Sequence, residues 1–194
     1  KKPMTSQYRF QTATTFYTLT KRVLDVTLCL LVLPVVLPLI GICGLLIYIQ
    51  DPGPVFFVQP RTGKAGRRFS MFKLRTMVTN AEEIKHQLRH LNELTWPDFK
   101  IKNDPRILPI GRFLRKTSLD ELPQIFNILG GDMSIVGPRP TSFSAETYSL
   151  HHTERLEIVP GLTGLWQVSG RSDVDFDDRV KMDVEYIERR SLWF

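Results

Sequence analysis

Cysteine and histidine are scarce in this chain of 194 residues, which contains two and four of them respectively. Cys29 and Cys43 have neither metal-ligand nor redox spacing. His86 and His90 lie four residues apart, but no third ligand is spaced to join them, so a solvated helix face explains them better than a metal site. This cysteine usage fits a reducing, cytosol-facing location.

Formal charge is absent from residues 26–49, where Leu, Val and Ile dominate. This run exceeds the roughly 20 residues that a helix needs to cross a bilayer. It is too long and too far from the start for the core of a signal peptide, and no small-residue cleavage pattern follows it. We therefore expect a membrane segment that stays in the mature protein.

Two prolines interrupt this apolar segment near its middle. Pro34 and Pro38 each remove a helix hydrogen bond and clash with the preceding turn, which costs about 3 kcal/mol in an ordinary helix interior. Basic residues stand on both sides of the segment, and such residues prefer the cytoplasmic side. We expect a re-entrant helix-break-helix hairpin over residues 21–50 with both ends cytoplasmic. A single-pass helix with a proline kink is the alternative.

Three charged residues stand at the entrance to the membrane segment. Lys21, Arg22 and Asp25 share one face of a helix, and local neutralisation explains their grouping. Lys21 and Arg22 could also hold membrane phospholipid phosphates, at roughly 1 kcal/mol each near an anionic surface.

The remaining patterns predict a mainly helical α+β protein. Residues 54–59 and 68–72 alternate like two short strands of a small β-hairpin. Residues 81–94 form a polar helical pattern, and residues 175–194 form an amphipathic one that could lie along a membrane interface. We expect residues 1–20 to be a flank or linker. Residues 51–194 then form a compact cytosolic catalytic domain with amphipathic interfacial helices around it.

The net charge of +6 and the pI near 9.5 indicate an acidic partner. Nucleic acid, an anionic membrane surface and a phosphorylated small molecule all satisfy this condition. Charge alone does not choose among them.

Asp120 and Glu121 form an acidic pair where an apolar helix is expected to begin, because Pro123 fits only a first turn. A capping box between Ser118 and Glu121 explains the pair without chemistry. However, Arg115 and other basic residues stand just upstream, and helix N-termini attract phosphate. Positive neighbours would lower the carboxylate pKa, which suits a nucleophile on phosphorus or a Mg²⁺ ligand.

Three further charged residues are candidates for substrate or phosphate binding. Arg139 lies between Pro138 and Pro140, which restrict the backbone, and a guanidinium held in this way suits a bidentate contact. A rigid turn with an incidental arginine is the alternative. Arg171 follows two glycine-containing stretches, a pattern shared by many loops, and Asp183 lies in the last helical segment as a surface or site residue.

The order of these motifs resembles the bacterial sugar transferase family, the monotopic phosphoglycosyl transferases that start exopolysaccharide, O-antigen and glycoprotein glycan synthesis. The resemblance runs from residue 21 to the end of the chain. It rests on KRVLD at 21–25, FKLRTM at 72–77, SLDELPQ at 118–124, GDMSIVGPRP at 131–140 and GLTGLWQVSGR at 161–171.

The resemblance implies transfer of a sugar 1-phosphate from a UDP-sugar to a polyprenyl phosphate such as undecaprenyl phosphate, with release of UMP. By position, Asp120 is the nucleophile that forms a covalent phosphosugar intermediate, and Glu121 is a partner that holds Mg²⁺ or assists proton transfer. Arg139 and Asp183 match further site residues. The implied location is the bacterial inner membrane with catalysis on its cytoplasmic face, and nucleic acid is not an expected partner.

The chain departs from the family pattern at two places. Arg75 stands where the family often has lysine, which keeps a charge for substrate phosphate but changes its geometry. The hairpin usually breaks at Ser-Pro, whereas this chain has Leu33 before Pro34. Family members also extend beyond both ends of this sequence, so we expect it to be part of a longer polypeptide, and homo-oligomer contacts are possible.

Two other functions compete with this reading. A membrane-anchored binding protein for acidic partners would use the basic residues as a surface and the acidic pair as a cap, but it leaves the GPRP motif unexplained. An aspartyl-phosphate hydrolase would use water in place of the lipid acceptor, but its usual Asp-x-Asp arrangement is absent around Asp120.

Overall fold

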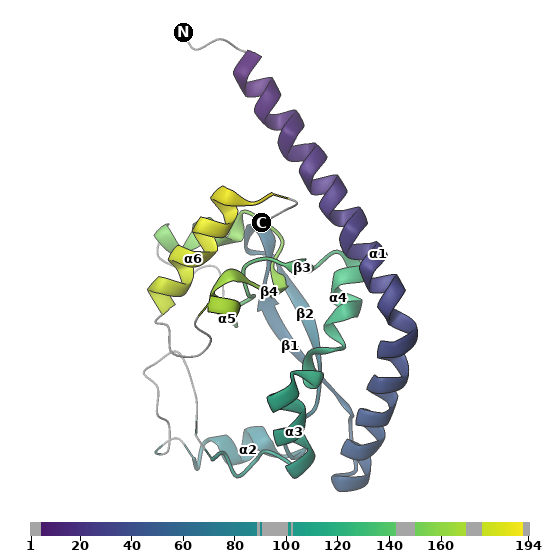
Figure 1. Ribbon diagram of the computed structural model, residues 1–194. Coiled ribbons are helices and arrows are strands. Elements are labelled where there is room, and N and C mark those ends of the chain that lie inside the picture. Colours follow the sequence, from purple (N-terminus) through teal and green to yellow (C-terminus); the bar gives the residue numbers. More distant parts are fainter. Residues whose placement is uncertain are drawn as a thin grey trace. The chain divides into compact units, whose positions relative to one another are not determined.

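The computed structural model describes residues 5–88, 90, 101, 103–142, 150–169 and 176–191, with side chains described from residue 16 onward (Figure 1). The chain divides into two compact units. Unit 1 comprises residues 1–34, 59–71 and 124–194, and unit 2 comprises residues 35–58 and 72–123. The described part is mainly helical with two small two-stranded sheets, which confirms the predicted α+β class.

The N-terminal element is one continuous helix, α1, which runs over Thr5–Gln50 (Figure 1). Its Phe16–Gln50 stretch is long and apolar enough to cross a membrane. The predicted helix break does not appear, because Pro34 and Pro38 both lie inside α1. The four-residue spacing puts both prolines on one face of the helix. The hydrogen bonds that they remove therefore lie on one side, and the backbone hydrogen bonds on the other side continue the helix.

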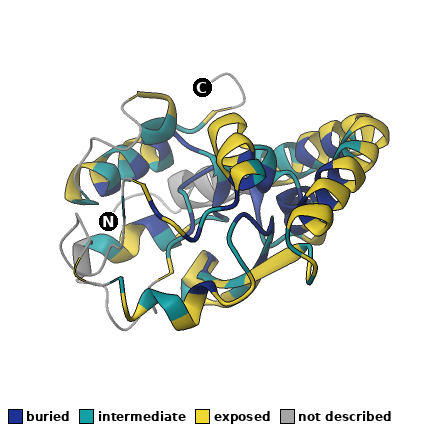
Figure 2. Cartoon of the chain, turned by 90° about the horizontal axis from the view of Figure 1, so that it is seen from below, coloured by how far each residue is buried: buried dark blue, intermediate teal, exposed yellow. Residues whose placement is uncertain are grey.

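One stripe of α1 is buried and the opposite face is exposed (Figure 2). Asp25, Cys29, Ile40, Cys43 and Ile47 are at most 6% exposed, and their spacings of three, four and eleven residues follow the helical repeat. The exposed face carries large apolar side chains, including Leu31, Val35, Leu45 and Ile49. An exposed apolar face of this kind is expected of a helix that contacts lipid.

The core of unit 2 joins α1 to a hairpin strand and a short helix. Strands β1 (Phe56–Thr62) and β2 (Arg68–Leu74) form the predicted hairpin, and a 3₁₀ turn at Lys64–Gly66 lies between them. Ile47 packs with Leu74 of β2 and with Leu114 of α3 (Pro109–Thr117). Helix α3 packs closely against the backbone of Thr76, because Gly111 has no side chain there. A Cβ on Gly111 would stand 2.1 Å from the Thr76 carbonyl oxygen.

The segment after α3 differs from the predicted helix start. Ser118 takes the left-handed conformation with φ of 59°, which ends α3. The 3₁₀ turn Leu119–Glu121, here called the acidic turn, follows it, and α4 (Gln124–Gly130) begins only after Pro123. Ser118 makes no side-chain capping hydrogen bond, so the capping box does not form.

Unit 1 contains a small parallel sheet and the C-terminal helices. Strand β3 (Ser134–Val136) pairs with β4 (Gly161–Thr163) in the register Ser134 to Gly161. A 3₁₀ segment, Leu150–Leu156, precedes β4, and helices α5 (Leu165–Ser169) and α6 (Phe176–Arg189) follow it. The predicted helix over 81–94 appears as the shorter α2 (Ala81–Lys85), and residues 89 and 91–100 lie outside the described part.

Candidate functional site

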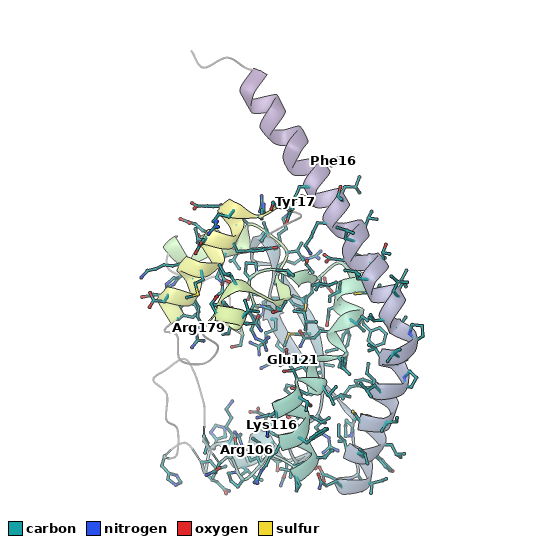
Figure 3. The ribbon with its side chains drawn as sticks, viewed as in Figure 1. Phe16, Tyr17, Arg106, Lys116, Glu121 and Arg179 are labelled. Atoms are coloured by element: carbon teal, nitrogen blue, oxygen red, sulfur yellow. The ribbon has the colours of Figure 1, made fainter. Side chains whose placement is uncertain are left out.

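The acidic pair lies on the acidic turn rather than at a helix N-terminus. Asp120 is 9% exposed, whereas Glu121 is partly exposed just beyond the end of α3 (Figure 3). The reversal at Ser118 and the bond from the Glu121 N–H to the Ser118 carbonyl hold this turn, at 3.2 Å. Both carboxylates are therefore largely withdrawn from water, Asp120 more so than Glu121.

Lys73 of β2 is the cation that pairs with this turn. Its Nζ lies 2.8 Å from Glu121 Oε1, and the two side chains are 17% and 16% exposed. A partly buried pair is screened less than a surface pair. Lys73 therefore orients Glu121 and supplies positive charge beside Asp120.

Burial dominates the titration of Asp120. Loss of water raises the pKa of Asp120 above its ordinary value, Lys73 and Arg115 act to lower it, and the charge of Glu121 raises it further. The expected net lowering of the pKa by basic neighbours is therefore wrong. The sequence reveals the neighbours but not the depth of the carboxyl group, and desolvation disfavours the charged form.

Arg115 lies close enough to Asp120 to act on its charge, and its Nε donates to Thr76 Oγ1 at 2.8 Å. Arg75 has a different environment from the one predicted. It is 7% exposed, its Nη1 contacts Asp51 Oδ2, and its Nε donates to the Pro54 carbonyl oxygen at 2.5 Å. These contacts do not fit the predicted phosphate binding by Arg75, because the guanidinium is committed to the segment after α1.

The acidic turn offers a limited set of metal ligands. Asp120 and Glu121 supply adjacent carboxylates, but one Glu121 oxygen is paired with Lys73. Across the residues whose side chains are described, no three His, Cys, Asp or Glu residues gather as a metal cluster. Mg²⁺ often takes one or two carboxylates and completes its shell with substrate phosphate and water. The donor set fits such an ion and does not fit a closed protein cage.

In unit 1, Arg139 lies on the loop after β3. It lines a small pocket together with Thr62, Thr141, Arg155 and hydrophobic residues. Its Nη1 lies 3.5 Å from the Leu162 carbonyl oxygen, which is a weak contact. The Arg139 side chain therefore borders the pocket, and Arg155 adds a second cation to its lining.

Asp183 of α6 is not at the surface. It is 1% exposed, and its Oδ2 lies 2.7 Å from Arg155 Nη2. The same Nη2 donates to the Arg139 carbonyl oxygen at 2.8 Å, whereas Asp183 Oδ2 has no well-aligned hydrogen bond. Burial raises the pKa of Asp183 to about 6 against the opposing charge of Arg155.

The charges at the start of the apolar stretch contact protein groups. Lys21 Nζ donates to Asp25 and to Ser134 Oγ, both at 2.6 Å, which agrees with local neutralisation. Arg22 donates to two backbone carbonyl oxygens of α4, including that of Leu129 at 2.7 Å. These contacts leave fewer N–H donors of Lys21 and Arg22 for the predicted phospholipid phosphates.

Two residues of these environments were missed by sequence reasoning, and one predicted residue lies outside the described part. Lys73 lies on β2, two positions before Arg75, which follows the last residue of that strand, so the alternating pattern could have indicated Lys73. Arg155 lies in a segment without a predicted motif. Arg171 is outside the described residues.

Comparisons with known proteins agree on one family. The bacterial sugar transferase family matches residues 16–194. The chain is 45% identical over 183 residues to the undecaprenyl-phosphate galactose phosphotransferase of Salmonella typhimurium, which covers 89% of this chain and 37% of that protein. It is 50% identical over 146 residues to the galactosyl transferase CpsE of Streptococcus agalactiae. The aligned residues cover 74% of this chain and 32% of that protein.

A third relative has a more similar length. The exopolysaccharide production protein ExoY of Rhizobium meliloti is 39% identical over 178 residues, which cover 89% of this chain and 79% of that protein. The chain thus spans about a third of the length of the Salmonella and Streptococcus relatives. On the family match over nearly its whole length, this chain belongs to the bacterial sugar transferase family.

Proposed function

We propose that this protein transfers a sugar 1-phosphate from a UDP-sugar to undecaprenyl phosphate and releases UMP, which begins the synthesis of a polysaccharide. Family membership supports this, as do relatives named for undecaprenyl-phosphate galactose and glucose 1-phosphate transfer. The observation that carries the proposal is the nearly buried Asp120 beside the Lys73–Glu121 ion pair.

The reaction proceeds in two displacements at one phosphorus. A carboxylate oxygen of Asp120 attacks the phosphorus that bears the sugar, the bond from that phosphorus to the bridging oxygen breaks, and UMP leaves with the electron pair. An oxygen of the lipid phosphate then attacks the same phosphorus. The bond to Asp120 breaks, which restores the carboxylate and gives the polyprenyl-diphosphate sugar.

The environment of Asp120 suits this role. A carboxylate that is largely removed from water loses less solvation on attack, and its raised pKa accompanies greater nucleophilicity. Lys73 offsets part of the cost of that charge and adds attraction for a diphosphate. Glu121, held by Lys73, is available as the partner of the nucleophile.

Mg²⁺ is the proposed cofactor, because a diphosphate substrate carries negative charge that must approach two carboxylates. Asp120 and Glu121 would hold the ion together with substrate phosphate oxygens, and the ion would neutralise charge on the diphosphate. The residues of the protein still provide the nucleophile and orient it.

The lipid acceptor places the site at a membrane, and chain connectivity supports one orientation of α1. Near the start of its apolar stretch, Arg22 binds carbonyl oxygens of α4, and near its end Gln50 Oε1 accepts a bond from the Ile110 N–H of α3 at 3.0 Å. Residues 111–127 between those contacts carry too many charged side chains to cross a bilayer. Both ends of α1 would therefore lie on one face, and the basic flanks make that face cytoplasmic.

The proposal is tested by a UMP-release assay with undecaprenyl phosphate and a panel of UDP-sugars that includes UDP-glucose and UDP-galactose. Asp120→Asn is expected to retain UDP-sugar binding and lose UMP release, because an amide is not a nucleophile toward phosphorus. Unchanged UMP release by this variant would overturn the covalent mechanism. Release of free sugar phosphate without lipid would identify a hydrolase, and indifference to every UDP-sugar would favour a binding protein.

A further inference from the structure

The loop that carries Arg139, residues 136–141, is held by its backbone from several sides. Its polar backbone groups bond to segments far away in the chain, namely Gly137 N–H to Thr163 O at 2.9 Å, Pro138 O to Gly161 N–H at 2.9 Å, and Thr141 O to Thr62 N–H at 3.0 Å. A Cβ on Gly161 would stand 2.1 Å from the Gly137 nitrogen. The middle of this loop therefore packs backbone against backbone.

Helix α6 adds two contacts to the same loop. The Tyr186 hydroxyl donates to the Val136 carbonyl oxygen at 3.1 Å. Asp183 pairs with Arg155, whose Nη2 donates to the Arg139 carbonyl oxygen. Asp183 and Tyr186 are three residues apart, so one face of α6 reaches the loop at two points around Gly137 and Pro138.

The side chains of Asp183, Tyr186 and Arg155 are almost fully buried. Asp183 is 1% exposed, Tyr186 is 5% exposed, and the residue that connects Asp183 to the loop, Arg155, is 5% exposed. A buried carboxylate beside a buried guanidinium has little freedom to reorient, because each would leave the other unpaired. Asp183 and Tyr186 therefore act on the loop, and neither belongs to the lining of the pocket.

We infer that Asp183 and Tyr186 are positioning residues that fix the direction of Arg139, Asp183 through Arg155 and Tyr186 through the Val136 carbonyl. The inference rests on the proposed function, in which Arg139 meets a substrate phosphate. Arg139 lines the pocket at the edge of this loop, so a shift of its backbone moves the guanidinium relative to the pocket. Misplacement by about 1 Å can cost up to about a hundredfold in rate.

The test is a pair of double-mutant cycles on UMP release, measured with enzyme in excess. Tyr186→Phe removes one hydroxyl and keeps the ring, and Asp183→Asn keeps the shape and removes the charge. Each variant is expected to lower the rate about tenfold in the native background and to have almost no further effect in an Arg139→Ala background. Losses that multiply with the loss caused by Arg139→Ala would overturn the inference, as would native rates in both single variants.

Two controls separate positioning from other effects. Lys181→Met and Glu185→Gln alter exposed charged side chains of the same helix. Both are expected to keep the native rate. A rate loss in either control equal to that of Tyr186→Phe would also overturn the inference.

Amide hydrogen exchange gives a readout that does not depend on activity. Tyr186→Phe and Asp183→Asn are expected to speed exchange in peptides that cover residues 136–141 and to leave the acidic turn unchanged. Unchanged exchange in the loop contradicts the inference. If the native protein releases no UMP while the loop responds as expected, the proposed function fails and the positioning contacts stand.

Discussion

Lys73 Nζ stands 2.8 Å from Glu121 Oε1, so the cation nearest the acidic pair bonds to the partner carboxylate and not to the proposed nucleophile. Asp120 experiences Lys73 as a charge that lowers its pKa, and it experiences Glu121 as a charge that raises it. The Lys73–Glu121 pair thus acts on the charge of Asp120, the proposed nucleophile, from both directions.

The pH dependence of UMP release follows from this arrangement. Asp120 must be ionised to attack, so the rate falls as pH falls through its pKa. Lys73→Met removes a charge that lowers this pKa, and the acid limb of the pH–rate profile is expected to move to higher pH. Lys64→Met, at an exposed lysine of the hairpin turn, is the control and is expected to leave the limb in place. A shift of the acid limb to lower pH in the Lys73→Met variant would contradict the electrostatic effect of Lys73 on Asp120.

Asp120→Asn is expected to stabilise the protein while it abolishes activity. Because the folded state raises the pKa of this carboxyl, the folded state binds its proton more tightly than the unfolded chain does. Ionisation at neutral pH therefore costs stability, and the cost disappears as pH falls below the ordinary value of 3.8. The Tm of the variant should exceed the native Tm at pH 7.5, and the difference should narrow toward pH 4.

The comparison for this stability measurement is Glu83→Gln, which neutralises an exposed carboxylate of α2 and should leave Tm unchanged. A lower Tm for Asp120→Asn at pH 7.5 would show that Asp120 stabilises the fold through its charge.

Arg75 is expected to serve stability and not phosphate binding. Arg75→Ala leaves Asp51 and the Pro54 carbonyl oxygen without their partner, and removing one member of a mostly buried pair costs about 3 kcal/mol of unfolding free energy. The exposed pair of Arg67 with Asp132 provides the contrast, and Arg67→Ala should cost at most about 1 kcal/mol. Denaturant unfolding in detergent measures both, and equal losses would contradict this assignment.

The orientation of α1 can be measured by thiol labelling. In a background of Cys29→Ser and Cys43→Ser, Leu19→Cys places a thiol at an exposed position near the start of the apolar stretch, and Lys64→Cys places one on the hairpin turn. A membrane-impermeant reagent is expected to label both in inverted vesicles and neither in intact spheroplasts. Labelling of the Leu19→Cys position from outside would establish a crossing helix.

Sequence patterns predicted elements whose signals are local. The hairpin was predicted within two or three residues because its strands alternate and its turn contains glycine. The predicted break in α1 does not appear in the structure. The effect of two prolines depends on whether they share a face and on the packing of the remaining turns, and the sequence does not show that packing. The start of α4 was misplaced because the left-handed turn at Ser118 is rare for serine and has no sequence signature.

In the candidate site, too, residues in local motifs were identified and residues that act through long-range contacts were missed. Asp120 and Glu121 were identified from their motif and neighbours, and that assignment remains a prediction. Lys73 and Arg155 were missed because their importance comes from contacts with residues 48 and 28 positions away, respectively, at Glu121 and Asp183. The direction of the Asp120 pKa shift was wrong for a related reason, since burial is a property of the fold and not of the adjacent sequence.

Ile47 has no exposed surface, and it packs among Leu74, Leu108 and Leu114 although it belongs to the apolar stretch of α1. The apolar stretch of α1 and the elements next to the acidic turn therefore share one hydrophobic core. Truncation at the end of α1 would not release a soluble active fragment, because it would open that core to water. Exchange of α1 for an unrelated transmembrane helix would fail for the same reason unless the buried stripe were transplanted with it.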